Sequence, residues 1–308
     1  MLSSIEICAG AGGQALGLEQ AGFKHATLVE IEEPACKTLI YNRSDWNVIR
    51  GDVKDFSAVD YKGIDLLAGG VPCPPFSVAG KQLGKNDERD LFPEALRLIS
   101  ECTPKAVMLE NVKGLLAPKF KDYCTNLTEQ IEGLGYTVFW KLLNACDFGV
   151  PQLRPRVVLV ALLNDIAHKF EWPESKIEPP TVGEALFDKM SIDGWEMAEE
   201  WKSFANKIAP TLVGGSKKHG GPDLGPTRAK KAWADLGVDG RGIADAPPKN
   251  GFKGMPRLTV PMAATIQGFP DSWKFFGRKT PAYRQIGNAF PPPVAKAVGL
   301  CIKNALVN

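Results

Sequence analysis

The sequence predicts an α/β protein whose main domain is a doubly wound, mostly parallel sheet. Short apolar runs of buried-strand length, such as Ile64–Ala68, Ala106–Leu109 and Val157–Leu163, alternate with helical patterns in the first half of the chain. Strands that alternate with helices of this size are typical of parallel βαβ units. After about Asn164 the alternation stops, and residues 201–256 hold ten glycines and six prolines. That composition predicts a second, smaller and irregular domain.

The elements of the first domain are predicted one by one from their apolar patterns. Strands are expected at Ser4–Ala9, Ala26–Glu30, Ile64–Ala68, Ala106–Leu109 and Val157–Leu163. Helices are expected at Gly13–Gly22, Pro34–Tyr41, Leu91–Glu101, Tyr123–Leu134 and Pro293–Leu306, the last long enough to pack back on the sheet. We therefore expect residues 1–164 plus 281–308 to form one domain and residues 165–280 the other, with a variable part at about 180–256.

The composition is that of an ordinary globular protein. Of the 308 residues, 44% are hydrophobic and 23% are charged, and no apolar stretch approaches the length needed to cross a membrane. The N-terminus runs almost at once into a glycine loop, which leaves no room for a signal peptide and favours a cytoplasmic location. Seven cysteines without a CxxC pair, beside only three histidines, argue against a disulfide framework and against a metal site.

Charge is unevenly distributed along a chain whose formal net charge is only +2. Residues 165–200 hold three Lys/Arg against ten Asp/Glu, whereas residues 201–256 hold ten Lys/Arg against four Asp. A locally basic segment in a nearly neutral chain indicates either an anionic partner or a solvated basic surface, and charge alone does not separate the two.

A first candidate site is the stretch CAGAGG, Cys8–Gly13, which follows a predicted strand and opens a predicted helix. Glycines there let backbone N–H groups approach a ligand at a helix N-terminus. Glu30 ends the next strand, where a carboxylate typically binds ribose hydroxyls, and Asp52 follows a further short strand. Together they indicate a cofactor that contains a nucleoside: NAD, FAD or S-adenosylmethionine. The glycine loop by itself could equally be a tight turn.

A second group of candidates follows the strands at the same edge of the sheet. Cys73 stands after Pro72, which restricts the backbone and pre-aims the sulfur as a nucleophile, although most cysteines are buried core residues. Glu110 follows the run AVML and could act as a general acid or hold a substrate ring, or simply end a strand. Arg154 and Arg156 point the same way in extended chain and could fix a carbonyl, a phosphate or the carboxylates already named, or form a surface salt bridge.

These stretches, taken in order, resemble bacterial DNA (cytosine-5)-methyltransferases over essentially the whole chain. The resemblance is carried by ICAGAGG, GDV, GGVPCPPFSVAG with DERDLFPEALRLI, ENVKGLL, LNACDFGVPQLRPR, RLTVPMAATIQGFPD and YRQIGNAFPPPVAKAVG. It implies that Cys73 attacks carbon 6 of a flipped-out cytosine and that carbon 5 then takes a methyl group from S-adenosylmethionine. Glu110 would hold the ring's nitrogen 3 edge, and Arg154 and Arg156 would anchor its carbonyl and the surroundings of Cys73.

The resemblance also implies the binding residues. The cofactor pocket would be lined by Cys8, Ala9, Gly10, Gly12, Gly13, Glu30, Ile31, Asp52, Val53, Pro72, Leu91 and Asn288. DNA would be met by Ser77, Lys81 and Arg89 of a mobile loop at 74–91, and by Lys217, Lys218, Arg228, Lys230, Lys231 and Arg241 of a target-recognition region. The domain at 165–280 would then be the target-recognition domain, and the other the catalytic and cofactor-binding domain. The partners implied are double-stranded DNA and a restriction endonuclease that acts on the same site without binding the enzyme, and the enzyme itself would be a monomer.

Three positions depart from the family's pattern. Cys8 stands where phenylalanine is usual, so an aromatic contact to the adenine would be missing or replaced. Pro74 stands where glutamine usually follows the catalytic cysteine, and the usual Arg-Glu pair before QGFP is absent. None of the three removes a group that the covalent step requires.

Three other functions would account for part of this pattern. A nicotinamide-dependent dehydrogenase would use the glycine loop and Glu30 but gives Pro72-Cys73 and Glu110 no role. A non-catalytic DNA-binding relative would not need Cys73, Glu110 and Arg154. A tRNA cytosine-5 methyltransferase is the nearest alternative, but the Cys-Phe-Thr signature of that branch is absent. The recognition sequence does not follow from the residues.

Overall fold

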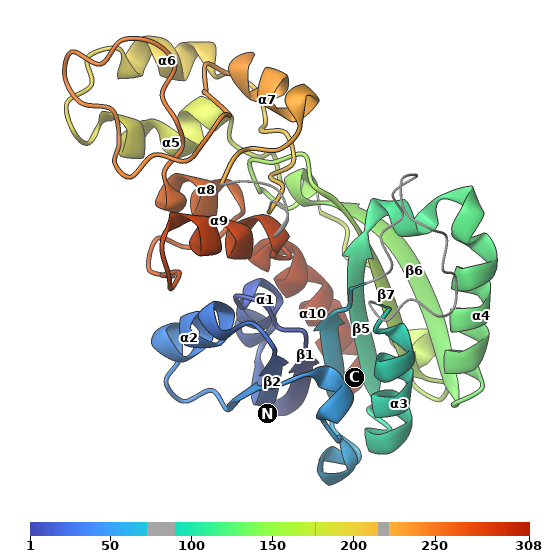
Figure 1. Ribbon diagram of the computed structural model, residues 1–308. Coiled ribbons are helices and arrows are strands. Elements are labelled where there is room, and N and C mark those ends of the chain that lie inside the picture. Colours follow the sequence, from blue (N-terminus) through green and yellow to red (C-terminus); the bar gives the residue numbers. More distant parts are fainter. Residues whose placement is uncertain (73–89, 176, 215–221) are drawn as a thin grey trace. The chain divides into compact units, whose positions relative to one another are not determined.

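A computed structural model of the chain describes residues 1–72, 90–175, 177–214 and 222–308 (Figure 1). The chain divides into two compact units. The sheet unit comprises residues 1–143, 155–174 and 294–308, and the second unit comprises residues 144–154 and 175–293. No helix in the described ranges combines the length and the apolar character needed to cross a membrane.

The sheet unit is built on seven strands in the order β3-β2-β1-β4-β5-β7-β6. The strands are β1 Leu2–Ile7, β2 Phe23–Glu30, β3 Val48–Arg50, β4 Leu66–Gly70, β5 Ala106–Val112, β6 Tyr136–Asn144 and β7 Pro155–Leu163. The pairs among β3, β2, β1, β4 and β5 are parallel, and β7 runs antiparallel to β5. The predicted doubly wound, mostly parallel sheet is therefore confirmed. The strand order reverses between β1 and β4, and folds of this kind bind their ligands beyond the carboxyl ends of such strands.

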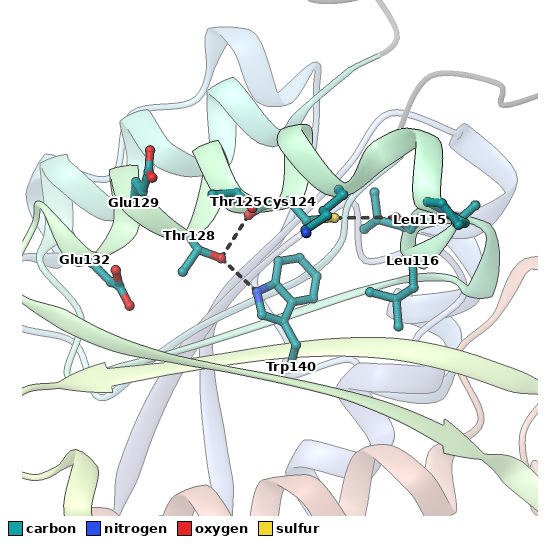
Figure 2. A pocket seen from close by; sticks show the side chains of 11 residues that line it. Leu115, Leu116, Cys124, Thr125, Thr128, Glu129, Glu132 and Trp140 are labelled. Atoms are coloured by element: carbon teal, nitrogen blue, oxygen red, sulfur yellow. Dashed lines mark hydrogen bonds between the residues drawn. The ribbon is translucent and has the colours of Figure 1, made fainter.

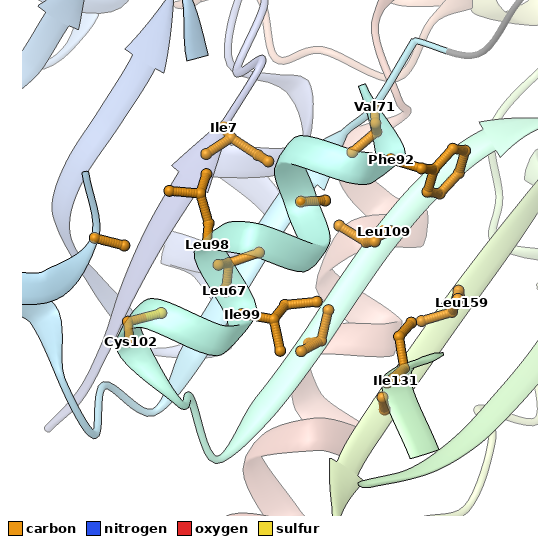
Figure 3. Packing of buried hydrophobic residues seen from close by; sticks show 14 of the residues in the cluster. Ile7, Leu67, Val71, Phe92, Leu98, Ile99, Cys102, Leu109, Ile131 and Leu159 are labelled. Carbon is orange, nitrogen blue, oxygen red and sulfur yellow. The ribbon is translucent and has the colours of Figure 1, made fainter. Parts of the chain in front are cut away.

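One face of the sheet is covered by α3 (Phe92–Cys102) and α4 (Lys121–Glu132). On α3 the buried residues recur at helical spacing, from Phe92 through Ala95, Leu98 and Ile99 to Cys102, because three- and four-residue steps return to the same side of a helix. Figure 3 shows this stripe packed over residues of β4, β5 and β7, with Ile131 of α4 beside it. This continuous apolar core fixes the strand ends that carry the candidate site.

The other helices of the sheet unit are α1 (Gly13–Ala21), α2 (Glu33–Asn42) and α10 (Pro292–Val307). Helix α10 packs closely on α1 at Gly299, where an added Cβ would lie 2.9 Å from a methyl carbon of Leu18 and 3.0 Å from the Cβ of Ala21. The predicted return of the C-terminal helix to the first domain is therefore confirmed.

Two strands lie at the edges of the sheet, and the sequence predicts them less well. β3 has three residues, and the sequence indicates it only as a short strand before Asp52. β6 is not predicted, because its apolar residues come in two short runs, VFW and LL, separated by Lys141, and the residues from Thr137 to Leu142 are only half-buried. Edge strands of this kind lack the strong apolar signal of the buried central strands.

The second unit is irregular, as its composition predicts. Its helices are short: α5 Val182–Ser191, α6 Ala198–Phe204, α7 Thr227–Ala234, α8 Val260–Ile266 and α9 Lys279–Asn288. In its described part the extended pairing amounts to isolated bridges rather than strands. None of these helices is predicted from the sequence, because residues 201–256 are dominated by turn-forming residues.

The unit bounds differ from the expected domain bounds at three places. Residues 144–154 and 281–293 belong to the second unit, and residues 165–174 belong to the sheet unit. The reason at 281–293 is a close contact inside the second unit, where a Cβ added to Gly287 would lie 2.4 Å from the Cα of Gly214. Sequence patterns do not reveal a backbone contact between residues so far apart.

Candidate active site

The glycine loop lies at the carboxyl end of β1, beside the reversal of the strand order. Cys8, Gly10 and Gly12 all have positive φ, of 51°, 55° and 84°, so the chain turns sharply before α1 begins at Gly13. The N–H of Gly12 donates to the carbonyl of Ala9, which is buried. A Cβ added at Gly10 would meet nothing within 4 Å, so glycine is needed there for its backbone conformation and leaves space above the loop.

Glu30 joins this loop to the end of β2. One of its carboxylate oxygens accepts a hydrogen bond of 2.7 Å from the N–H of Gly10, and the other accepts one of 2.8 Å from the N–H of Glu32. The side chain is 6% exposed, and burial raises its pKa while these backbone donors oppose that rise. Because a carboxylate can accept about four hydrogen bonds, Glu30 keeps capacity for a ligand hydroxyl.

Cys8 is a half-buried thiol at the start of the loop. Burial raises its pKa to about 12, and the carboxyl groups of Glu30, Asp52 and Glu6 add to the effect. The thiol is therefore neutral at physiological pH and is not a nucleophile, since thiolates carry that reactivity. Its side chain packs against the apolar core of the sheet unit.

The remaining predicted cofactor residues of the sheet unit border the same strand ends. Ile31 follows β2 and is exposed, whereas Asp52 accepts a hydrogen bond from the N–H of Lys54 and begins a short 3-10 turn with the buried Val53. Pro72 is exposed, and its carbonyl accepts a bond of 3.2 Å from the N–H of Leu91 at the start of α3. The loops after β1, β2, β3 and β4 thus meet at one edge.

Glu110 and Arg156 form the charged centre of this edge. Glu110 lies in β5 in parallel register with Gly70 of β4, and Arg156 lies in β7 in register with Val112. The Nε of Arg156 is 2.8 Å from a carboxylate oxygen of Glu110, with the side chains 12% and 10% exposed. Burial lowers the pKa of Arg156, and Glu110 opposes that shift. Arg156 therefore holds the carboxylate of Glu110 in place next to β4, the strand that leads to Pro72.

Arg154 does not join this pair. It precedes β7, is fully buried, and donates to the carbonyls of Leu212, Gly287 and Ala289, all in the second unit. Arg154 and Arg156 therefore have different partners, because the regular strand begins only at Pro155 and these three carbonyls bind the guanidinium of Arg154. These hydrogen bonds give Arg154 a structural role within the second unit.

The DNA-binding candidates have different surroundings. Arg228 and Lys231 are exposed on α7, whereas Lys230 forms an ion pair of 2.6 Å with Asp223. Arg241 forms an ion pair with Asp239. Asn288, which was predicted to bind the cofactor, is exposed at the end of α9. Cys73, Ser77, Lys81, Arg89, Lys217 and Lys218 lie outside the described residues.

Two residues that were not among the predicted site residues belong to these surroundings. Asn111 is 7% exposed and donates from Nδ2 to the carbonyl of Val71, which ties β5 to the chain just before Pro72. The sequence signal for Asn111 was its position directly after Glu110 in the stretch ENV. Arg257 binds the same carboxylate as Arg241, and only its position one residue beyond the basic segment could have indicated it.

A separate surface pocket of about 690 Å³ lies between α4 and β6 (Figure 2). Its walls include Leu115, Leu116, Cys124 and Trp140, and the indole N–H of Trp140 donates to the hydroxyl of Thr128. No predicted site residue lines it. It is therefore distinct from the glycine loop and the Glu110–Arg156 pair.

Comparison with known proteins agrees with this geometry. The sequence model of the family described as C-5 cytosine-specific DNA methylase matches residues 2–304. The chain is 61% identical over 308 residues to the Type II methyltransferase M.NgoMIV of Neisseria gonorrhoeae, covering 99% of this chain and 98% of that protein. It is 60% identical over 311 residues to the Type II methyltransferase M.NaeI of Lentzea aerocolonigenes, covering 99% and 75%.

Solved structures share the fold at lower sequence identity. A putative DNA modification methyltransferase encoded within an Escherichia coli prophage superposes with a TM-score of 0.71 at 23% identity, over the whole of both chains. DNMT2 of Spodoptera frugiperda superposes with a TM-score of 0.69 at 16% identity, over 99% of this chain and all of that one. The family match over nearly the whole chain identifies this protein as a member of the C-5 cytosine-specific DNA methylases, and hence as a DNA (cytosine-5) methyltransferase.

Proposed function

We propose that the enzyme transfers a methyl group from S-adenosylmethionine to carbon 5 of a cytosine flipped out of a specific duplex sequence, through a covalent bond from Cys73. The observation that supports this most is the buried Glu110–Arg156 pair, in register with the end of β4. Two residues beyond Gly70 the chain reaches Pro72, which precedes Cys73 in sequence. A nucleophile, a carboxyl group and a fixed positive charge are the groups that this reaction needs.

The described residues fit S-adenosylmethionine. The open space at Gly10 and the N–H groups at the start of α1 suit close approach of a ligand to the backbone, and Glu30 is placed to accept ribose hydroxyls. Asp52 and Ile31 border the same strand ends, where an adenine would lie. When bound, S-adenosylmethionine supplies an electrophilic methyl group.

The residues of this chain then have separable tasks. The Cys73 thiolate forms a bond to carbon 6, which moves electrons to carbon 5 and makes that carbon the nucleophile for the methyl group. Glu110 holds the edge of the ring at nitrogen 3 and lowers the cost of the charge that develops there, and Arg156 keeps its carboxyl group in place. Loss of the carbon 5 proton to a base then expels the Cys73 sulfur and leaves 5-methylcytosine.

The relatives support a cellular role. M.NgoMIV and M.NaeI are described as Type II methyltransferases, so we propose that this enzyme protects a restriction site cut by a separate endonuclease. Cytoplasmic location and a monomeric state fit an enzyme that acts on bacterial DNA one site at a time, and both remain predictions.

The covalent assignment is tested with Cys73→Ser and a matched control, Cys301→Ser, on the half-buried thiol of α10. With tritiated S-adenosylmethionine and duplex DNA, the first variant should transfer no measurable label yet bind the cofactor, and the control should match the unchanged enzyme. DNA containing 5-fluorocytosine should trap an adduct on the Cys73 peptide. Equal turnover by Cys73→Ser, or an adduct on another cysteine, would overturn the assignment.

Substrate class is tested by competition between duplex DNA and tRNA in the same assay. We expect DNA to accept the methyl group and tRNA to leave the rate unchanged. A tRNA that is methylated in preference to DNA would move the enzyme to the tRNA-methylating branch.

A further inference from the structure

One carboxylate in the second unit holds two arginines. The Nε and one terminal nitrogen of Arg241 bind the two oxygens of Asp239 at 2.8 and 3.1 Å, and the Nε of Arg257 binds it at 2.9 Å. The Asp239 side chain is 10% exposed, whereas those of Arg241 and Arg257 are 76% and 45% exposed. The carboxylate is thus buried beneath two guanidinium groups that face solvent, and the three side chains carry a net charge of one positive unit.

The backbone around the trio is fixed. The N–H of Asp239 donates to the carbonyl of Pro256, and that of Ala244 donates to the carbonyl of Leu258, so the two segments run side by side. A Cβ added at Gly242 would lie 3.3 Å from a terminal nitrogen of Arg257, which shows how closely that guanidinium lies along the chain. The arginines are therefore oriented before any partner arrives.

The neighbouring helix provides a contrast. Helix α7 packs against the same segment, since a Cβ added at Gly240 would lie 3.2 Å from the Cα of Lys230. Arg228 and Lys231 on this helix are exposed, and no ion pair in the described part of the chain restrains either. Freely moving cations suit phosphates, whose negative charge is accessible from many directions. Oriented guanidinium groups suit a partner that requires a fixed geometry.

Each arginine keeps a hydrogen-bonding edge for such a partner. Arg241 uses Nε and one terminal nitrogen on Asp239, and Arg257 uses Nε, so within the described residues terminal N–H groups of both remain directed elsewhere. In the major groove a planar pair of N–H donors matches one base edge, the O6 and N7 acceptors of guanine.

We propose that Arg241 and Arg257, held by Asp239, read guanines in the target sequence. The inference rests on the proposed function, because it takes duplex DNA as the substrate. It predicts a recognition site with at least two guanines that are read through their major-groove edges. Arg228 and Lys231 would contribute affinity without sequence preference.

The test begins with bisulfite sequencing of DNA from a host that expresses the enzyme, which gives the site. Duplexes are then made with 7-deazaguanine at one guanine at a time, which removes the N7 acceptor. For the unchanged enzyme we expect kcat/KM to fall about 5- to 100-fold at each guanine that an arginine reads. Arg241→Lys and Arg257→Lys keep the charge but lose the planar pair of donors, so each variant should become insensitive to 7-deazaguanine at one position.

Two control variants separate reading from general effects. Lys231→Gln should lower kcat/KM similarly for every duplex and reduce its dependence on salt. Arg43→Lys alters an ion pair of the same bidentate kind in the sheet unit, where Arg43 binds Glu19, and should leave the 7-deazaguanine pattern unchanged. Unchanged hydrogen exchange of the segments that carry the substitutions shows that each variant is folded, because cofactor affinity reports mainly on the sheet unit.

Each result decides the question. If the unchanged enzyme tolerates 7-deazaguanine everywhere, or if both lysine variants keep every penalty, Arg241 and Arg257 do not read guanine and their contact with Asp239 is structural. If the unchanged enzyme methylates no duplex DNA at all, the proposed function fails and this inference fails with it.

Discussion

Both units of this protein have buried apolar residues, but the second unit also buries a network of long polar side chains. In the sheet unit the core is a continuous set of apolar residues, with Leu67, Leu98 and Leu109 all at most 2% exposed. In the second unit the buried centre includes Gln152, Arg154 and Gln267, each 0% exposed. Gln152 accepts from the N–H of Leu212 and donates to the carbonyl of Ile266, and Gln267 donates to the carbonyl of Ala289. The helices of the second unit are short, and hydrogen bonds from buried side chains therefore connect segments that regular backbone pairing does not join.

The difference shows what each kind of core demands. An apolar core tolerates exchanges of similar volume, because its attraction is not directional. A buried polar network is directional, and removing one member leaves its partners without hydrogen bonds. The second unit should therefore be the more sensitive to single polar substitutions, and the sheet unit to loss of apolar volume.

The largest expected effect is that of Arg154→Met. It removes the Arg154 donor from the carbonyls of Leu212 and Gly287 and one of two donors from the carbonyl of Ala289, and it should destabilise the second unit by about 3–5 kcal/mol. Hydrogen exchange resolved by segment is the suitable measurement, because two units need not unfold together. Arg43→Met, at an arginine that is 35% exposed, should cost under about 1 kcal/mol. If Arg154→Met and Arg43→Met lowered the free energy of unfolding equally, the polar network would not be what stabilises the second unit.

Next in size is Leu98→Ala in the sheet unit. Leu98 is fully buried on α3, so the substitution leaves a cavity and should cost about 3 kcal/mol. Leu300→Ala, on the exposed side of α10, is the matched control and should cost well under about 1 kcal/mol. The same hydrogen-exchange experiment should show the loss in the sheet unit. A loss confined to the second unit would contradict the separation of the two cores.

Glu30 sharpens the comparison, because it is a buried polar group of the sheet unit that we propose binds the ribose of the cofactor. Burial raises its pKa, so as pH falls it gains a proton earlier than an exposed glutamate and becomes a poorer acceptor for ribose hydroxyls. The dissociation constant of S-adenosylmethionine should therefore rise severalfold between about pH 8 and about pH 5. Titration calorimetry should show this rise in the unchanged enzyme and in Glu33→Gln, an exposed control, but not in Glu30→Gln. If the dissociation constant of the unchanged enzyme did not vary with pH, Glu30 would not bind the ribose hydroxyls.

The smallest effect concerns the thiols of the sheet unit. Burial raises the pKa of Cys8 and of Cys102 to about 12 and that of Cys36 to about 11, so all three are neutral at about pH 8. Iodoacetamide should alkylate the Cys73 peptide at least about tenfold faster than the peptides of these three. Peptide mass spectrometry over a time course measures the order. Labelling of Cys8 as fast as Cys73 would contradict its assignment as an inert packing residue.

Much of the sheet unit follows from the sequence alone. Its central strands and its helices were predicted within a few residues, because burial on a sheet or along a helix imposes a regular spacing that can be read in one dimension. The glycine loop, Glu30 and Glu110 were singled out because each lies at or just beyond the end of a predicted strand, and the carboxyl ends of parallel strands meet at one edge.

What only the tertiary structure decided lies mainly in long-range polar contacts. The ion pair of Glu110 with Arg156, the separate partners of Arg154 and the shared carboxylate of Asp239 join residues whose spacing in sequence carries no period. A hydrogen bond depends on the direction of both partners, and that direction is set only when distant segments pack. The sequence alone therefore determined the class of fold, the family and the edge at which chemistry occurs. Packing decided which charged side chains meet there and which turn instead to hold the second unit together.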